Sequence, residues 1–247
     1  MDLQSKIKAD GTLERYKVRL VAKGYTHSYG IDYLENFAPM AKMTTIRILI
    51  SLAATFGWKL QQLDVKNDFL HGDLEEEVFI ELPLGFQQGG AGKTCRLKKA
   101  LYGLKQSPQA WFGRFSKAIK SMGYHQSKED HTPFIKHLGG TVTALLVYID
   151  DIVVTGNNEE QQQQLLKQNL AKDFEIKDLS VLKYFLRIEV AYSKTGIFLS
   201  QRKYVLDLLA KIGLIGGKGV GTPVDPNTKL QENPTRERSE IKEDFNG

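Results

Sequence analysis

The chain has 247 residues, of which 41% are hydrophobic and 26% are charged, and its formal net charge is +5 at pH 7. These values are typical of a soluble globular protein with a sizeable core, and no apolar run approaches the roughly 20 residues of a membrane-spanning helix. The single cysteine, Cys95, excludes an intrachain disulfide and a cysteine-based zinc site and favours an intracellular location. The mild basic excess is compatible with a polyanionic partner but does not by itself indicate one.

The N-terminal part predicts a strand, a helix and a second strand, in that order. Residues 16–22 alternate weakly and carry basic side chains. Apolar side chains recur at helical spacing over residues 44–56, where Thr44 can cap the start and Gly57 ends the pattern. A strand is expected directly afterwards, over residues 58–65.

The second predicted helix leads into a hairpin. Ser107 is a candidate N-cap, Pro108 suits the first helical position, and an apolar stripe continues until Gly123. Strands are expected over residues 134–138 and 141–149, because the Gly-Gly between them is a strong hairpin signal.

Further strands and helices are expected in the C-terminal half. In chain order they are a strand over 152–155, a helix over 159–172, strands over 182–190 and 196–199, and a helix capped by Ser200. The whole pattern indicates an α+β fold, in which an antiparallel sheet has its helices packed on one face. Residues 1–15 are expected to be a flexible segment and residues 225–247 a polar, disordered tail.

Asp150 and Asp151 interrupt an apolar, strand-forming run. Ionised aspartate is rarely buried unless it is paired or holds a metal, and adjacent strand residues point to opposite faces. We therefore interpret the pair as the tip of a hairpin that presents both carboxylates at the edge of a sheet. An ordinary solvated turn is the alternative, and for an isolated pair of aspartates it is the more common case.

A third carboxylate, that of Asp64, ends the β-prone run of residues 61–65. If this strand neighbours the hairpin, the three carboxylates converge. They could then hold two Mg²⁺ ions about 3.5–4 Å apart, which would polarise an attacking hydroxyl and stabilise a leaving pyrophosphate.

Several sequence blocks accompany these acids in a fixed order. They lie at residues 19–26, 35–39, 62–72, 101–111, 148–151, 183–186 and 199–201. Tyr148-Ile149-Asp150-Asp151 matches the Tyr-x-Asp-Asp box of reverse transcriptases. The set, spread over roughly residues 7–230, resembles the reverse transcriptase (RNA-dependent DNA polymerase) domain of copia-type LTR retrotransposon polyproteins.

The resemblance implies a fingers and palm domain over residues 16–224, with an antiparallel palm sheet, and a truncated chain that lacks thumb, integrase and ribonuclease H. It implies RNA-directed DNA polymerase activity, in which dNTPs are joined to a primer 3′-hydroxyl on an RNA or DNA template. The implied cofactor is a pair of Mg²⁺ ions, for which Mn²⁺ can substitute. The implied location is the cytoplasm, within a virus-like particle, or the nucleus, with no membrane partner; the oligomeric state is not indicated.

Site residues follow from the resemblance by position. Asp64, Asp150 and Asp151 would be the catalytic, metal-binding carboxylates. The implied nucleotide- and template-binding residues are Arg19, Lys23, Val65, Phe69, Tyr102, Gly103, Lys105 and Gln106. The implied primer-region residues are Lys183 and Tyr184. Phe69 would exclude a ribose 2′-hydroxyl, although plain core packing is an equal alternative for its ring.

The chain also departs from the family pattern. Asp68 stands where alanine is usual, next to the implied triphosphate site, and this extra anion is expected to repel the nucleotide or disturb the metals. Ser180 and Arg187 replace usual glycines, and Arg187 is expected to obstruct a close backbone approach. These departures keep an alternative open, which is a folded but inactive fragment that at most binds nucleic acid. An RNA-recognition module is a weaker alternative, because the strands around Asp150 are aliphatic.

Overall fold

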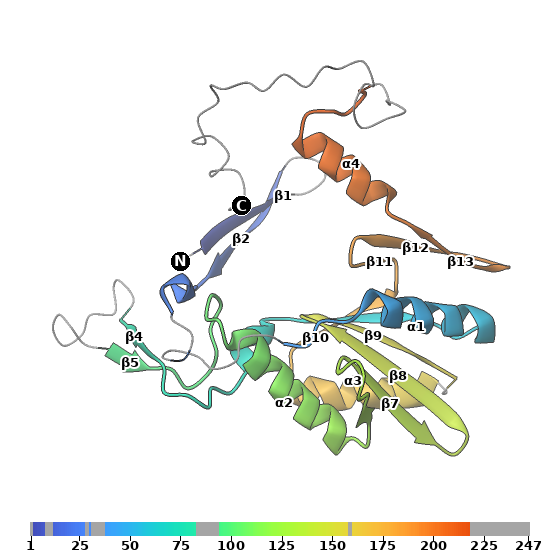
Figure 1. Cartoon of the computed structure of the whole chain (residues 1–247), viewed down its shortest axis with the longest axis horizontal. Coiled ribbons are helices and arrows are strands. Elements are labelled where there is room, and N and C mark those ends of the chain that lie inside the picture. The colour runs from blue at the N-terminus through green and yellow to red at the C-terminus, as the bar shows by residue number, and fades with distance from the viewer. Residues whose placement is uncertain are drawn as a thin grey trace, which may run out of the picture. The chain divides into compact units, whose positions relative to one another are not determined.

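The computed structural model describes residues 2–7, 12–27, 30, 38–82, 94–157 and 160–217 (Figure 1). It divides into two units, residues 1–201 and 202–247, and the second contributes helix α4 (Arg202–Lys211). Within the described ranges, no helix combines the length and the apolar character needed to cross a membrane. The polar tail predicted over residues 225–247 lies outside the described residues.

A six-stranded antiparallel sheet forms the centre of the first unit. In spatial order its strands are β10 (Ile176–Val181), β3 (Gln61–Val65), β9 (Asp151–Gly156), β8 (Thr141–Tyr148), β7 (Pro133–Leu138) and β6 (His125–Gln126). The predicted α+β class is therefore confirmed. The order also places β3 directly beside β9, although the two strands are far apart in the sequence.

Helices cover both faces of this sheet, so the prediction that they pack on one face is wrong (Figure 1). Helices α2 (Ser107–Ser121) and α3 (Glu160–Asp173) share one core with β3, β8 and β9, whereas α1 (Met43–Phe56) packs on the opposite face. The reason lies in β8, where Leu145 and Val147 enter the first core and Leu146 enters the second. A strand with consecutive buried residues must be covered on both faces.

Aromatic side chains fill the first core. Trp111, Phe115 and Phe134 are each at most 1% exposed, and Phe174 packs edge-on against Trp111 with 5.1 Å between ring centroids. Burying such large side chains supplies about 1.5–3 kcal/mol each, which makes this cluster the main support of the α2 face.

The remaining described strands form three smaller sheets. They are β1 (Asp2–Ile7) with β2 (Leu13–Arg19), β4 (Phe79–Glu81) with β5 (Thr94–Arg96), and β11 (Tyr184–Phe185) with β12 (Ile188–Ser193) and β13 (Gly196–Ser200). Short 3₁₀ helices span Gly24–Thr26 (η1) and Asp68–His71 (η2). Part of the segment expected to be flexible, residues 1–15, thus pairs as β1 and β2, and its flexibility stays a prediction.

The continuous strand predicted over residues 182–190 is wrong, because a tight turn divides it. Phe185 pairs with Ile188, and the two residues between them, Leu186 and Arg187, have φ angles of 49° and 65°. Positive φ at both central positions is the signature of a type I′ turn, which favours glycine. Ser180 also has a positive φ, of 65°. A left-handed backbone is a conformational reason for the glycines that the resemblance implies at both positions, and the close approach expected at Arg187 stays a prediction.

The helix ends agree only in part with the predicted caps. Gly57 ends α1 in the left-handed conformation as predicted, with φ of 68°, but α1 begins at Met43, before Thr44. Ser107 is the first residue of α2 rather than its N-cap, and its hydroxyl donates to the carbonyl of Leu101 at 2.6 Å. Ser200 ends β13, and α4 begins only at Arg202.

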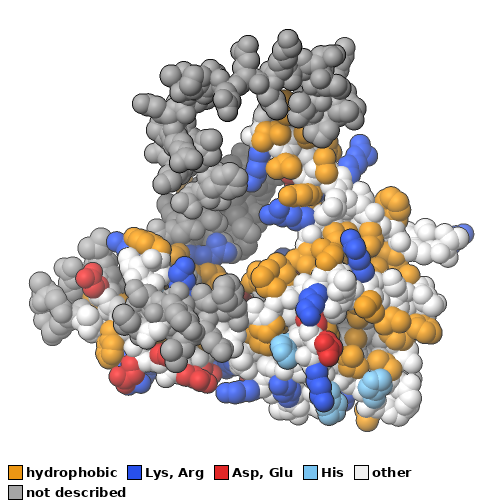
Figure 2. All heavy atoms as spheres, in the orientation of Figure 1, with side chains coloured by type: hydrophobic (Ala, Val, Ile, Leu, Met, Phe, Trp, Pro, Cys, Tyr) orange, Lys and Arg blue, Asp and Glu red, His pale blue; other side chains and the backbone are white. Residues whose placement is uncertain are grey.

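Charge is spread over the surface. On the face drawn in Figure 2, the described Lys and Arg side chains (blue) are interleaved with hydrophobic and acidic ones. This distribution agrees with the modest net charge of +5.

Candidate active site

Asp64 and Asp151 lie opposite each other on neighbouring antiparallel strands, β3 and β9. Directly paired residues project from the same face of a sheet with their Cβ atoms close together. Leu63 and Ile152, which alternate with them, point into the first core. The two carboxylates therefore share the opposite face, at the end of the sheet where β8 turns into β9.

The turn itself is shifted by one residue from the predicted tip. Tyr148 pairs with Asp151, so Ile149 and Asp150 form the turn and Asp151 is already the first residue of β9. Ile149 has φ of 54°, and of these two central residues it alone has a positive φ. This is the pattern of a type II′ turn, where glycine is favoured. A β-branched residue in this conformation stores strain of about 1–3 kcal/mol.

Two hydrogen bonds hold the strained turn in place. The indole N–H of Trp111 donates to the carbonyl of Ile149 at 3.0 Å, and the N–H of Val65 donates to the carbonyl of Asp150 at 2.8 Å. Trp111 comes from α2 and Val65 from β3, directly after Asp64. The turn is thus fixed to the strand that carries the third acid, which makes strain at this point sustainable.

The carboxylates influence one another electrostatically. The pKa of Asp151 is raised to about 6, because burial and the charges of Asp150 and Asp64 outweigh the lowering effect of a 2.8 Å hydrogen bond from Gln62. Neighbouring negative charges disfavour ionisation, and a divalent cation would relieve that repulsion. Carboxylate oxygens are also the ligands that Mg²⁺ prefers.

Among the residues that the structure describes, no group of three or more His, Cys, Asp or Glu side chains is arranged to hold a metal ion. Asp64 and Asp151 nevertheless pair across β3 and β9, Asp150 is next to Asp151 in the chain, and carboxylates are the type of ligand that such an ion prefers. Their role as metal ligands stays a prediction.

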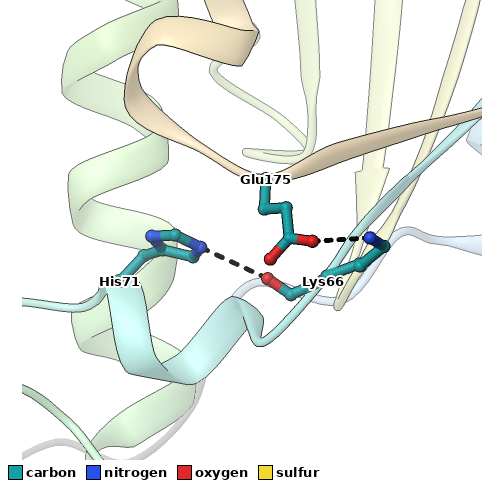
Figure 3. A network of polar contacts seen from close by, with 3 residues as sticks. All are labelled: Lys66, His71 and Glu175. Carbon is teal, nitrogen blue, oxygen red and sulfur yellow. Dashed lines mark hydrogen bonds and ion pairs between the residues drawn. The ribbon is translucent and has the colours of Figure 1, made fainter.

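Polar contacts brace the chain just after Asp64 (Figure 3). The Nζ of Lys66 pairs with Glu175 Oε1 at 2.5 Å, and the ring Nε2 of His71 donates to the carbonyl of Lys66 at 3.2 Å. The N–H of Lys66 also donates to the carbonyl of Glu175 at 2.9 Å. Because the Lys66 and Glu175 side chains are about half exposed, the backbone bond holds this segment better than the ion pair does.

A second cluster surrounds Tyr102. Its hydroxyl donates to Asp68 Oδ1 at 2.9 Å, its ring meets that of Phe69 edge-on at 5.2 Å between centroids, and the Arg19 guanidinium lies 5.3 Å from its centroid. Burial raises the pKa of Asp68 to about 6, and the charge of Asp150 raises it as well. The two clusters therefore lie within electrostatic reach of each other.

Glycines allow the Arg19 segment to reach Tyr102. A Cβ on Gly103, which has φ of 89°, would lie 2.2 Å from the carbonyl oxygen of Ala22. A Cβ on Gly24 would lie 1.9 Å from the carbonyl oxygen of Gly103. The N–H of Ala22 donates to the carbonyl of Tyr102 at 2.7 Å. Packing within the protein thus explains Gly103, and its contact with a template stays a prediction.

The other predicted site residues have different surroundings. Val65 and Gln106 are 2% and 3% exposed, so their side chains offer almost no surface to a ligand. Lys23, Lys105, Lys183 and Tyr184 are exposed. Tyr184 precedes Phe185, whose ring packs against that of Tyr148 at 6.3 Å between centroids. The segment predicted to lie near the primer is thereby connected to the Tyr148–Asp151 box.

Gln62 and Trp111 lie in the blocks that carry the resemblance, but sequence reasoning did not give either of them its supporting role in the site. Gln62 is a polar residue beside Leu63 in a β-prone run, and a polar side chain in such a run is a sequence signal of a buried hydrogen bond. In the structure it is 7% exposed. Trp111 belongs to an apolar helical stripe, from which only core packing could be inferred.

Comparisons with known proteins agree with these features. Residues 3–226 match the family model of reverse transcriptase (RNA-dependent DNA polymerase). The chain is 44% identical over 226 residues to a retrovirus-related Pol polyprotein from transposon RE1 of Arabidopsis thaliana, covering 91% of this chain and 15% of that protein. It is 40% identical over 233 residues to one from transposon TNT 1-94 of Nicotiana tabacum, covering 92% and 18%.

The chain thus spans less than a fifth of the length of these relatives. No solved structure matches it. The match across most of the chain and the ordered motifs lead to one assignment: the chain belongs to the reverse transcriptase family found in copia-type retrotransposon Pol polyproteins.

Proposed function

We propose that the chain is the palm and fingers region of an RNA-directed DNA polymerase, which transfers nucleotides from dNTPs to a primer 3′-hydroxyl on an RNA or DNA template. The observation that carries this proposal is the pairing of Asp64 with Asp151 across β3 and β9, with Asp150 in the strained turn beside them. Phosphoryl transfer depends mainly on positioning and charge neutralisation, and cations held by a fixed group of acids would supply both.

Asp64, Asp150 and Asp151 would hold Mg²⁺, or Mn²⁺ in its place. When bound, such ions supply Lewis acidity to the attacking hydroxyl and the leaving pyrophosphate. The protein's own part is to hold the carboxylates in place, which the hydrogen bonds of Trp111 and Val65 to the backbone of the turn favour. Phe69 would lie beside the nucleotide sugar, and Arg19 would offset triphosphate charge.

A second candidate function is a folded fragment that binds nucleic acid without catalysis. Asp68 favours it, because it adds a buried acid within electrostatic reach of Asp150. At neutral pH a group with a pKa of about 6 is mostly ionised, so the extra charge is present under ordinary assay conditions.

Primer extension on an RNA template, with dNTPs and either Mg²⁺ or Mn²⁺, separates the two functions. If the chain is a polymerase, the full chain should extend the primer and Asp150→Asn should lose this activity. Asp173→Asn, a matched change at an exposed aspartate of α3, should retain it. No product above the Asp150→Asn background would contradict the polymerase. Salt-dependent binding of the primer–template without extension would favour the second function.

A further inference from the structure

We propose that Asp68 is a positioning residue for sugar selection: through Tyr102 it fixes the ring of Phe69, the residue proposed to exclude the ribose 2′-hydroxyl. This inference rests on the proposed polymerase function and deepens it. It also gives a use to the acid that departs from the family pattern, which the sequence suggested only as an obstacle.

Two side-chain contacts of Tyr102 and the chain link between Asp68 and Phe69 connect the three residues. Asp68 and Phe69 are neighbours in η2, and Tyr102, from the segment before α2, contacts both of them. The hydroxyl of Tyr102 donates to Asp68 Oδ1 at 2.9 Å, and the rings of Tyr102 and Phe69 meet at 67° with centroids 5.2 Å apart. Edge-to-face contact at this distance is a favourable, directional arrangement. The orientation of the Phe69 ring therefore depends on where the Tyr102 ring is held.

Other contacts fix Tyr102 on its remaining sides. The Arg19 guanidinium lies 5.3 Å from the ring centroid, and the carbonyl of Tyr102 accepts the N–H of Ala22 at 2.7 Å. Burial raises the pKa of Tyr102 to about 12, and the charge of Asp68 raises it too. The hydroxyl accordingly keeps its proton at neutral pH and remains the donor to Asp68.

The surroundings of Asp68 point away from a purely stabilising role. The residue is 4% exposed, and its Oδ2 has no hydrogen-bond partner among the described residues. A carboxylate buried with one oxygen unpaired opposes folding rather than favouring it. Phe69 is only partly buried against the first core, so part of its ring remains available to a ligand.

The test compares deoxynucleotide with ribonucleotide incorporation by the full chain. In single-nucleotide primer extension, the measured quantity is the ratio of kcat/KM for a dNTP to that for the matching rNTP. Tyr102→Phe and Asp68→Ala are expected to lower this ratio about tenfold, because each frees the ring that supports Phe69. Asp68→Asn keeps an oxygen acceptor for the Tyr102 hydroxyl and is expected to retain the ratio within about threefold.

Tyr124→Phe is the matched control. Tyr124 is buried in the first core, and its hydroxyl is hydrogen-bonded to Thr143 rather than to the Phe69 cluster. The Tyr124→Phe variant should leave the ratio of kcat/KM for dNTP to that for rNTP unchanged. If Asp68→Ala fails to fold, Tyr102→Phe decides the matter, since it removes a single oxygen atom.

The outcomes separate the two proposals. An active wild-type chain whose ratio is the same in Tyr102→Phe and Asp68→Ala would overturn the positioning role and leave the polymerase intact. A wild-type chain that extends no primer above Asp150→Asn would overturn both.

Discussion

The indole N–H of Trp111 and the carbonyl oxygen of Ile149 are joined by a 3.0 Å hydrogen bond that connects helix α2 to the turn of the Tyr148–Asp151 box. Trp111 is 1% exposed and packs within an aromatic group that includes Phe115 and Phe174. The position of a strained turn thereby depends on a fully buried part of the core, and this relationship makes a mutation in α2 a test of the site.

Trp111→Phe should reduce nucleotidyl transfer more than it reduces stability. The change removes the indole donor to the Ile149 carbonyl and leaves a small cavity, which together should cost about 1–3 kcal/mol of stability. Because the turn carries Asp150, a displacement of even a fraction of an ångström is expected to lower the extension rate about tenfold or more.

The control for this change is Phe115→Leu, which trims the same core without touching the turn. Urea unfolding gives the stability of each variant, and primer extension at a temperature where both are folded gives the rate. Equal rates in the two variants would show that the Trp111 hydrogen bond does not position the site.

Ser180→Gly should stabilise the protein. Ser180 has φ of 65° and an exposed side chain, and its N–H donates to Asp178 Oδ1 at 2.7 Å. Glycine keeps that N–H and removes the left-handed penalty of about 1–2 kcal/mol, although it loses part of the gain to a more flexible unfolded chain. We expect a net gain of about 0.5 kcal/mol in the free energy of unfolding.

Ser51→Gly provides the opposite control. Ser51 is exposed in the middle of α1, so glycine there should lower the free energy of unfolding by about 0.5 kcal/mol. The two variants make the same chemical change and differ only in backbone conformation. A loss of stability in both would contradict the left-handed assignment at Ser180.

Local sequence patterns predicted the features that depend on neighbouring residues. The Gly-Gly hairpin between β7 and β8 follows from apolar runs that end in turn residues. The pairing of the Asp64 strand with the strand of Asp151 joins distant segments, so sequence reasoning supplied it only as a condition. The placement of α1 was missed because its cover of the second face is a tertiary effect. The consecutive apolar residues of β8 and β9 were the available sign of burial on both faces.

Conformation and long-range contact explain the rest of the discrepancies. Positive φ at Ile149 and Arg187 cannot be inferred from side chains that normally avoid it. The partner of Asp68 is Tyr102, 34 residues away, so sequence suggested its charge but not its hydrogen bond. The N-terminus of α1 is capped by Asp130, which is 88 residues away from Lys42 in the sequence.

The free energy of unfolding of the wild type should decrease, relative to that of Asp68→Asn, as the pH rises from about 4 to about 7. Asp68 has a pKa of about 6 when folded and an ordinary value near 3.8. In the folded protein it therefore keeps a proton that the unfolded chain releases, so rising pH favours unfolding across this window. This difference in pKa between the folded and unfolded chain corresponds to a loss of at most about 3 kcal/mol in the free energy of unfolding, for a group that is 4% exposed.

Urea unfolding of both proteins at several pH values measures the difference. Asp151 also has a raised pKa, but it is present in both proteins and cancels. A difference that stays flat from pH 4 to pH 7 would place Asp68 in a solvated environment.

Asp130→Asn should destabilise the protein by about 2–3 kcal/mol at pH 7, because Asp130 caps α1 from a distant part of the chain. Its Oδ2 accepts the N–H of Lys42 at 3.0 Å and the hydroxyl of Thr45 at 2.6 Å, and its Oδ1 accepts the N–H and hydroxyl of Thr132 at 3.0 and 2.7 Å. Four donors thus converge on two oxygens, whereas an amide offers one oxygen and turns an NH₂ group toward donors.

The pH dependence of the Asp130 variant distinguishes this cap from a generic surface effect. Burial raises the pKa of Asp130, but the hydrogen bonds from Thr45 and Thr132 outweigh it, so the pKa is lowered overall. A carboxylate whose pKa is lowered by folding stabilises the fold at pH values above its ordinary pKa, and this contribution is lost as the pH falls. The difference in the free energy of unfolding between wild type and Asp130→Asn should therefore narrow in acid.

Asp73→Asn, at a 63% exposed carboxylate paired with Lys99, is the control and should change the free energy of unfolding by less than about 1 kcal/mol. If Asp130→Asn unfolds at the same urea concentration as this control, α1 does not depend on Asp130 for its N-terminal cap.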